Sequence, residues 1–264
     1  MRKILFTTLV TALLTACGDS KQQQPASEPP APAEKPAVLI DNTPVEALAI
    51  GGTLVALNTD SSLADPENAG WRDAQEYRLD LMLAPPVHQS INLRHDASAP
   101  PRPVFLRAAS DGENMYLRMR WSDATENGTS GRTEFADAAA VQFALDAGAS
   151  TSFMMGAANG PVNIWYWKAS EAGAQNLAAG GFGSTTSLET AGLSSNSVYR
   201  DNGEWVVVFS RPIQAQGDHQ VALANGSANM AFALWEGDNK QRDGLKHVTM
   251  GWVTLQSASE GPAS

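Results

Sequence analysis

Apolar and polar residues alternate with a period of two along much of the chain, which is typical of β-strands. The alternation is clearest in residues 77–83 and 115–121. The second segment carries Arg118 and Arg120 on its polar face, so it predicts a half-buried strand. Shorter apolar runs predict further strands at 104–108, 139–145, 162–167, 205–210, 230–235 and 248–255.

No segment holds a helical apolar stripe over three turns, and Gly, Asn and Asp separate the apolar runs. We therefore expect an all-β fold, an antiparallel immunoglobulin-like β-sandwich with long loops and little helix. Residues 169–197 show little patterning and are expected to form a long loop. Asp201-Asn202-Gly203 predicts a hairpin turn before the strand at 205–210.

The first residues have the composition of a targeting segment, with two positive charges followed by a short apolar core. Leu14-Thr15-Ala16-Cys17 resembles the lipobox of bacterial lipoproteins, which are cleaved before the cysteine and acylated on it. The alternative is an ordinary secretory signal with an incidental cysteine. We expect a signal peptide at 1–16, acylated Cys17 with a Pro/Ala-rich tether at 17–37, and one folded domain at 38–264. The protein would lie on the periplasmic side of the cell envelope, anchored by lipid in the outer membrane, because Gly18 replaces the aspartate of inner-membrane retention.

Charge and cysteine content exclude several classes of protein. The formal net charge of −10 and the absence of a Lys/Arg cluster argue against nucleic-acid binding. Because Cys17 is the only cysteine, the chain can hold neither a disulfide framework nor a thiolate metal site. Covalent haem attachment through Cys-x-x-Cys-His is excluded on the same ground.

Three segments together carry a family resemblance. They are Asp137–Lys168 with its Met154-Met155-Gly156 turn, Gly203–Pro212, and Ala233–Trp252 with Arg242-Asp243-Gly244-Leu245-Lys246. This combination resembles the haem-binding domain of the ethylbenzene dehydrogenase gamma-subunit family. The resemblance implies one non-covalent b-type haem with Met155 and Lys246 as axial iron ligands. Met154 is the alternative to Met155, since neighbours in an extended segment point to opposite faces.

The chemistry of such a pair is consistent with electron transfer. A thioether is a soft ligand that favours ferrous iron, whereas an amine binds iron only after losing its proton. Two axial ligands leave no position on the iron for a substrate. His88, His95, His219 and His247 are rival ligands by residue type, and His247 is the strongest of them because it neighbours Lys246.

The resulting hypothesis is a membrane-anchored, periplasmic one-electron carrier that is not catalytic on its own. The resemblance implies molybdenum/iron–sulfur oxidoreductase subunits or a c-type cytochrome as partners. The alternative is a haem-free lipoprotein module that binds carbohydrate or protein, with Trp165 and Trp167 as stacking platforms on one strand face.

Overall fold

The structure, a computed structural model, describes residues 44–146, 151–214, 217–224 and 226–257. The predicted signal peptide, Cys17 and the tether at 17–37 lie outside the described residues. No helix in the described part of the chain is long and apolar enough to cross a membrane. The helices there are the single turns α1 (Gln89–Asn92) and a 3-10 turn at Ala69–Arg72.

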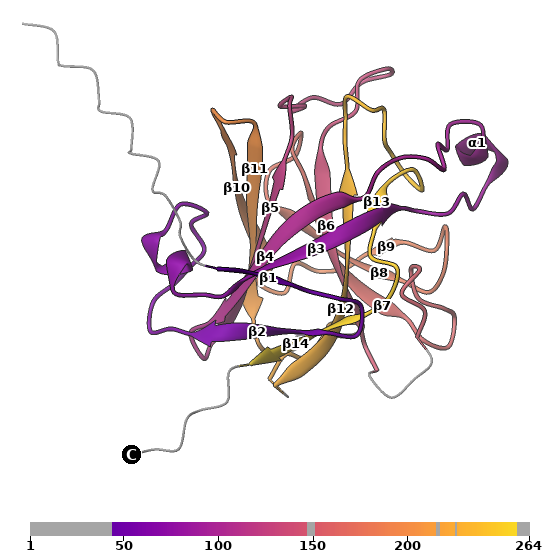
Figure 1. Ribbon diagram of the computed structural model, residues 1–264. Coiled ribbons are helices and arrows are strands. Elements are labelled where there is room, and N and C mark those ends of the chain that lie inside the picture. Colours follow the sequence, from indigo (N-terminus) through magenta and orange to yellow (C-terminus); the bar gives the residue numbers. More distant parts are fainter. Residues whose placement is uncertain (1–43, 147–150, 215–216, 225, 258–264) are drawn as a thin grey trace, which may run out of the picture. The chain divides into compact units, whose positions relative to one another are not determined.

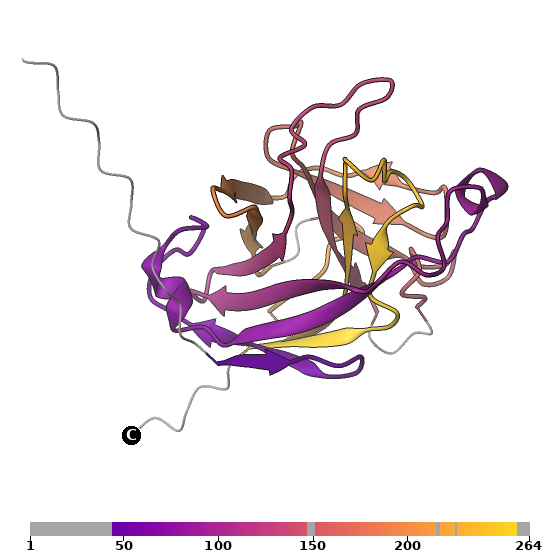
Figure 2. The ribbon, with the colours of Figure 1, turned by 45° about the horizontal axis from the view of Figure 1, so that its top comes forward.

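Two sheets form the domain (Figures 1 and 2). The first sheet contains β1 (Val45–Ala47), β2 (Thr53–Asn58), β3 (Glu76–Leu83), β4 (Arg102–Ser110), β5 (Asn114–Ser122), β10 (Ser194–Arg200) and β11 (Glu204–Pro212). The second contains β6 (Ala138–Ala144), β7 (Val162–Lys168), β8 (Ala174–Ala179), β9 (Thr186–Ser187), β12 (Ser227–Trp235), β13 (His247–Val248) and β14 (Val253–Ser257). The sheets join where β2 pairs with β14 and β3 pairs with β13, so hydrogen-bonded strands close a ring.

The core lies between the sheets and is built from alternate residues of facing strands. On β5 the inward positions are Met115, Leu117, Met119 and Trp121, and the second sheet contributes residues such as Val141, Phe143, Trp165 and Phe232. The predicted all-β fold with little helix is confirmed. Most strand pairs are antiparallel, but β1–β3, β2–β4 and β2–β14 are parallel.

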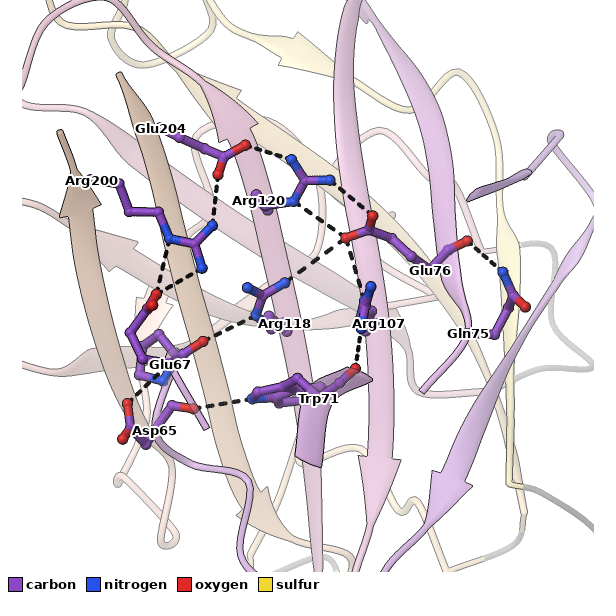
Figure 3. A network of polar contacts seen from close by, with 11 residues as sticks. Asp65, Glu67, Trp71, Gln75, Glu76, Arg107, Arg118, Arg120, Arg200 and Glu204 are labelled. Atoms are coloured by element: carbon purple, nitrogen blue, oxygen red, sulfur yellow. Dashed lines mark hydrogen bonds and ion pairs between the residues drawn. The ribbon is translucent and has the colours of Figure 1, made fainter. Parts of the chain in front are cut away.

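The outer face of β5 is buried, although its alternation predicted a polar, exposed face. The segment before β3 covers it and places Trp71 over the sheet (Figure 3). Arg118 and Arg120 pair there with Glu76, which also receives Arg107 (Figure 3). The arginines therefore attach a covering segment to the sheet, a role that strand periodicity alone does not reveal.

Two further predictions from the sequence are wrong. Residues 169–197 were expected to form a loop, yet they contain β8, β9 and the start of β10. The strand β8 is held by pairing with β7, and its Asn176 is buried among polar partners, so it lacks an apolar pattern. The apolar run at 248–255 is not one strand, because residues 249–252 separate β13 from β14.

Candidate functional site

A cavity of about 660 Å³ lies on the outer face of the second sheet, which points away from the core. Its floor consists of the outward residues of β6, β7 and β12. Four of these floor residues are alanines: Ala138, Ala140, Ala231 and Ala233. Small side chains on the adjacent strands β6 and β12 leave a recess of the size that buries a small-molecule ligand. The run Ala138-Ala139-Ala140 and the pair Ala231 and Ala233 around Phe232 are the signal by which the sequence could have revealed this floor.

The walls of the cavity are mainly apolar. Val87 and Ile91 come from the segment around α1, and Phe182 comes from the loop after β8. Tyr166 and Trp235 rise from the floor and meet edge to face, with ring centroids 5.5 Å apart. Burial raises the pKa of Tyr166 to about 12, so the phenol stays protonated. A largely apolar recess with aromatic side chains suits a flat apolar ligand.

Met155 lines this cavity from a turn in an unusual backbone conformation. Its φ is 67°, in the left-handed region that costs a non-glycine residue energy, and Gly156 follows with φ 72°. A Cβ at Gly156 would lie 2.9 Å from the carbonyl oxygens of Ala179 and Gly160, so only glycine fits there. The turn thus holds Met155 in place, and a strained residue at a cavity favours a functional role.

Lys246 enters the cavity from the opposite side, at the end of a tight turn. The N–H of Leu245 donates to the carbonyl of Arg242 (2.9 Å), and the indole N–H of Trp235 donates to the carbonyl of Asp243 (3.1 Å). The carbonyl of Lys246 itself accepts from the N–H of Ala84, which follows β3 (2.8 Å). The backbone that carries the lysine is therefore fixed on both sides of its side chain.

The structure brings Met155 and Lys246 together. The Nζ of Lys246 lies 3.8 Å from the Sδ of Met155 and 4.7 Å from the ring centre of Trp235. Burial lowers the pKa of Lys246 to about 8, while Asp243 acts weakly in the opposite direction. An amine with this pKa can give up its proton to a metal near neutral pH. Met154 also lines the cavity, but the contact with Lys246 is made by Met155.

The rival ligands lie elsewhere. All four histidines are within the described residues, and none of them lines the cavity. His247 is buried on the other side of its strand from Lys246, with its Nδ1 3.4 Å from the Nε2 of Gln241. Burial and nearby Arg102 lower the pKa of His247 to about 4, so the ring is neutral.

The alternative hypothesis used Trp165 and Trp167 as stacking platforms for a sugar, but both are core residues. Trp165 is fully buried and Trp167 is 3% exposed, both between the two sheets. Neither ring offers a face to a ligand at the surface. The hypothesis of a glycan-stacking face on this strand is therefore wrong.

A cluster of three buried carboxylates was missed from the sequence because its members are far apart along the chain. Asp123, Asp137 and Glu236 each place a carboxylate oxygen within 4.8 Å of the others. Asp137 accepts from the backbone of Asn127 and Gly237 and from the indole of Trp205, while Arg102 pairs with Glu236. Burial and the neighbouring carboxylates raise the pKa of Asp123 to about 7. The cluster joins the ends of β5, β6 and β12 next to the turn that carries Lys246.

Comparisons with known sequences point to one family. A family described as ethylbenzene dehydrogenase matches residues 68–200 and 186–247. The chain is 40% identical to dimethylsulfide dehydrogenase subunit gamma of Rhodovulum sulfidophilum over 195 residues, 72% of this chain and 73% of the relative. It is 35% identical to chlorate reductase subunit gamma of Ideonella dechloratans, over 73% of this chain and 79% of the relative. A Haloferax mediterranei protein, provisionally named a respiratory nitrate reductase heme subunit, is 36% identical over 54% of this chain and 52% of its own.

Among solved structures, a family 9 carbohydrate-binding module from Caldicellulosiruptor kristjanssonii is similar with a TM-score of 0.49 and 9% identity. The similarity covers 80% of this chain and 98% of that structure. No conclusion about function rests on a likeness of this degree.

Proposed function

The chain belongs to the ethylbenzene dehydrogenase family, and on that premise we propose that it binds one b-type haem and transfers single electrons as a gamma-like subunit or partner of a molybdenum oxidoreductase. Its relatives carry the names of gamma and heme subunits of such enzymes. The protein would supply an electron path and leave the substrate chemistry to its partner.

The observation that carries the proposal is the approach of Met155 Sδ to Lys246 Nζ, 3.8 Å apart inside a cavity with a small-residue floor. Transition-metal bonds to nitrogen and sulfur are about 2.0–2.1 and 2.3 Å, by the values for zinc. The nitrogen and the sulfur therefore lie close enough for one iron to be held by both after a small shift, so the donor pair fits the group.

The chain's own residues would do three things at the bound haem. Met155 and Lys246 would supply the sulfur and nitrogen ligands that hold the iron. Tyr166 and Trp235 would pack on the macrocycle and keep water away from it. When bound, the haem supplies a couple that exchanges one electron, and its thioether ligand favours the ferrous state.

The location and the partners are part of the proposal. Acylation of Cys17 would anchor the protein at the periplasmic side of the outer membrane, with residues 17–37 as a spacer. The partners would be molybdenum/iron–sulfur oxidoreductase subunits or a c-type cytochrome. Incorporation of labelled fatty acid by the wild type but not by Cys17→Ser, measured in growing cells, tests the anchor.

The test of the proposed function is a haem titration followed by a potentiometric titration. We expect one haem per chain, low-spin spectra in both oxidation states and a one-electron Nernst slope. We also expect the reduced protein to resist carbon monoxide, because Met155 and Lys246 would already occupy the iron. Absence of a Soret band, or rapid binding of carbon monoxide, would contradict the proposal.

A further inference from the structure

The charged residues that line the cavity are mainly positive, whereas the chain as a whole is negative. The whole chain has a formal net charge of −10, yet the cavity is lined by three cations and one carboxylate. The cations are Lys168, Arg242 and Lys246, and the carboxylate is Asp243. With Lys246 assigned to the iron, Lys168 and Arg242 have no part in the proposed function so far.

Both of these cations lie at the same end of the cavity. In the strand register Ala138 is opposite Lys168 on β7 and opposite Trp235 on β12, so these residues form one row. Arg242 lies near this row because its guanidinium carbon is 5.0 Å from the ring centre of Phe135. The segment from Phe135 leads directly into β6 at Ala138.

The other end of the cavity carries no charge. Gln142 is opposite Ile164 and Ala231 there, and its side-chain amide donates to the carbonyl of Phe153 (2.9 Å). Ala138 and Gln142 are four residues apart on one strand, which corresponds to roughly 13 Å. The cavity is therefore polarised along β6, with two cations at one end and uncharged groups at the other.

The present partners of the two cations are weak competitors. The Nζ of Lys168 is 3.3 Å from Glu171, whose side chain is 42% exposed. The Nε of Arg242 is 3.6 Å from Asp243, whose side chain is 83% exposed. Exposed ion pairs contribute little, so a ligand carboxylate can replace them at small cost. A guanidinium and an ammonium both form charge-assisted hydrogen bonds with carboxylates, which are stronger than hydrogen bonds between neutral groups.

We propose that Lys168 and Arg242 form a carboxylate-binding end of the cavity that receives the two propionates of the haem. This inference rests on the proposed function and adds the residues that would meet the carboxylates of the macrocycle. The site thereby selects a macrocycle with free carboxylates over one whose carboxylates are blocked.

The test compares iron protoporphyrin IX with its dimethyl ester, both added to the apoprotein in the same dilute detergent. Quenching of tryptophan fluorescence gives the dissociation constants. Because exposed ion pairs contribute only modestly, we expect the wild type to prefer the free acid by about two- to fivefold for each cation. The double variant Lys168→Gln/Arg242→Gln should lose this preference while its affinity for the ester stays unchanged.

The matched control is Lys240→Gln, which removes one positive charge from the same loop as Arg242 but does not line the cavity. This variant should keep the preference for the free acid. Equal affinity of the wild type for both macrocycles, or a double variant that still discriminates, would overturn the inference and leave the proposed function standing. Failure of both macrocycles to bind would overturn the proposed function itself.

Discussion

The pKa of Lys246 predicts how the affinity for haem depends on pH. An amine binds iron only without its proton, so the proton and the metal compete for the same lone pair. Below the pKa, each unit of pH should raise the association constant of the lysine-ligated form tenfold. Above the pKa the amine is already free, and the constant should level off. Since burial lowers the pKa to about 8, the break should come near pH 8.

The size of the effect follows from the same shift. At pH 7 an amine of pKa about 8 loses its proton far more easily than an ordinary lysine of pKa 10.5. The burial of Lys246 by the surrounding walls therefore makes ligation easier by about 3 kcal/mol, or by roughly a few hundredfold in the fraction of free amine.

The assay is a titration of the apoprotein with reduced haem at pH values from 6 to 10, read from the low-spin α band. The matched variant is Lys246→Arg, which keeps a positive charge of similar reach but cannot lose its proton at these pH values. We expect the variant to give no low-spin band at any of them. A wild-type slope that continues to pH 10 without a break, or a low-spin band in Lys246→Arg, would refute the reasoning.

Other residues lead to further predictions. Met155→Leu should abolish the low-spin spectrum of the reduced protein, whereas Met154→Leu should preserve it, because the contact with Lys246 belongs to Met155. Ala140→Leu should fill the cavity floor and prevent haem binding without lowering the melting temperature. In contrast, Ala139→Leu changes the core side of β6 and should lower the free energy of unfolding in urea titrations by about 1–3 kcal/mol. Burial raises the pKa of Asp123 from 3.8 to about 7, so between pH 4 and pH 7 the folded state binds more protons than the unfolded state. The free energy of unfolding should therefore fall as pH rises through this range. Asp123→Asn should reduce that slope in thermal melts, and an unchanged slope would contradict the assignment.

The strands with an alternating pattern were predictable from the sequence. β3, β5, β7 and β12 present one face to a dry core, and the core selects apolar residues at every second position. β8 and β10 were not predictable, because pairing with a neighbouring strand holds them and their exposed or polar positions carry no alternation. Local patterns record the solvent on each face of a strand, and they do not record which strand lies beside it.

The candidate site also contains residues that could be predicted from the sequence and residues that could not. Met155 and Lys246 were reached through a pattern of residues that resembles a known family, and the structure brings their side chains together. The carboxylate cluster could not be found from spacing, because Asp123, Asp137 and Glu236 come from the ends of three strands. Such a cluster depends on the register of the sheet, which one sequence does not specify.

The proposed function depends on the binding of one haem iron by Met155 and Lys246. The most direct measurement is the absorption spectrum of the purified, haem-loaded protein, oxidised and reduced, for the wild type, Met155→Leu and Lys246→Arg. We expect sharp α and β bands in the reduced wild type and their loss in each variant, with the folded structure retained by circular dichroism. A wild type without a Soret band, or variants that keep the wild-type bands, would contradict the proposal.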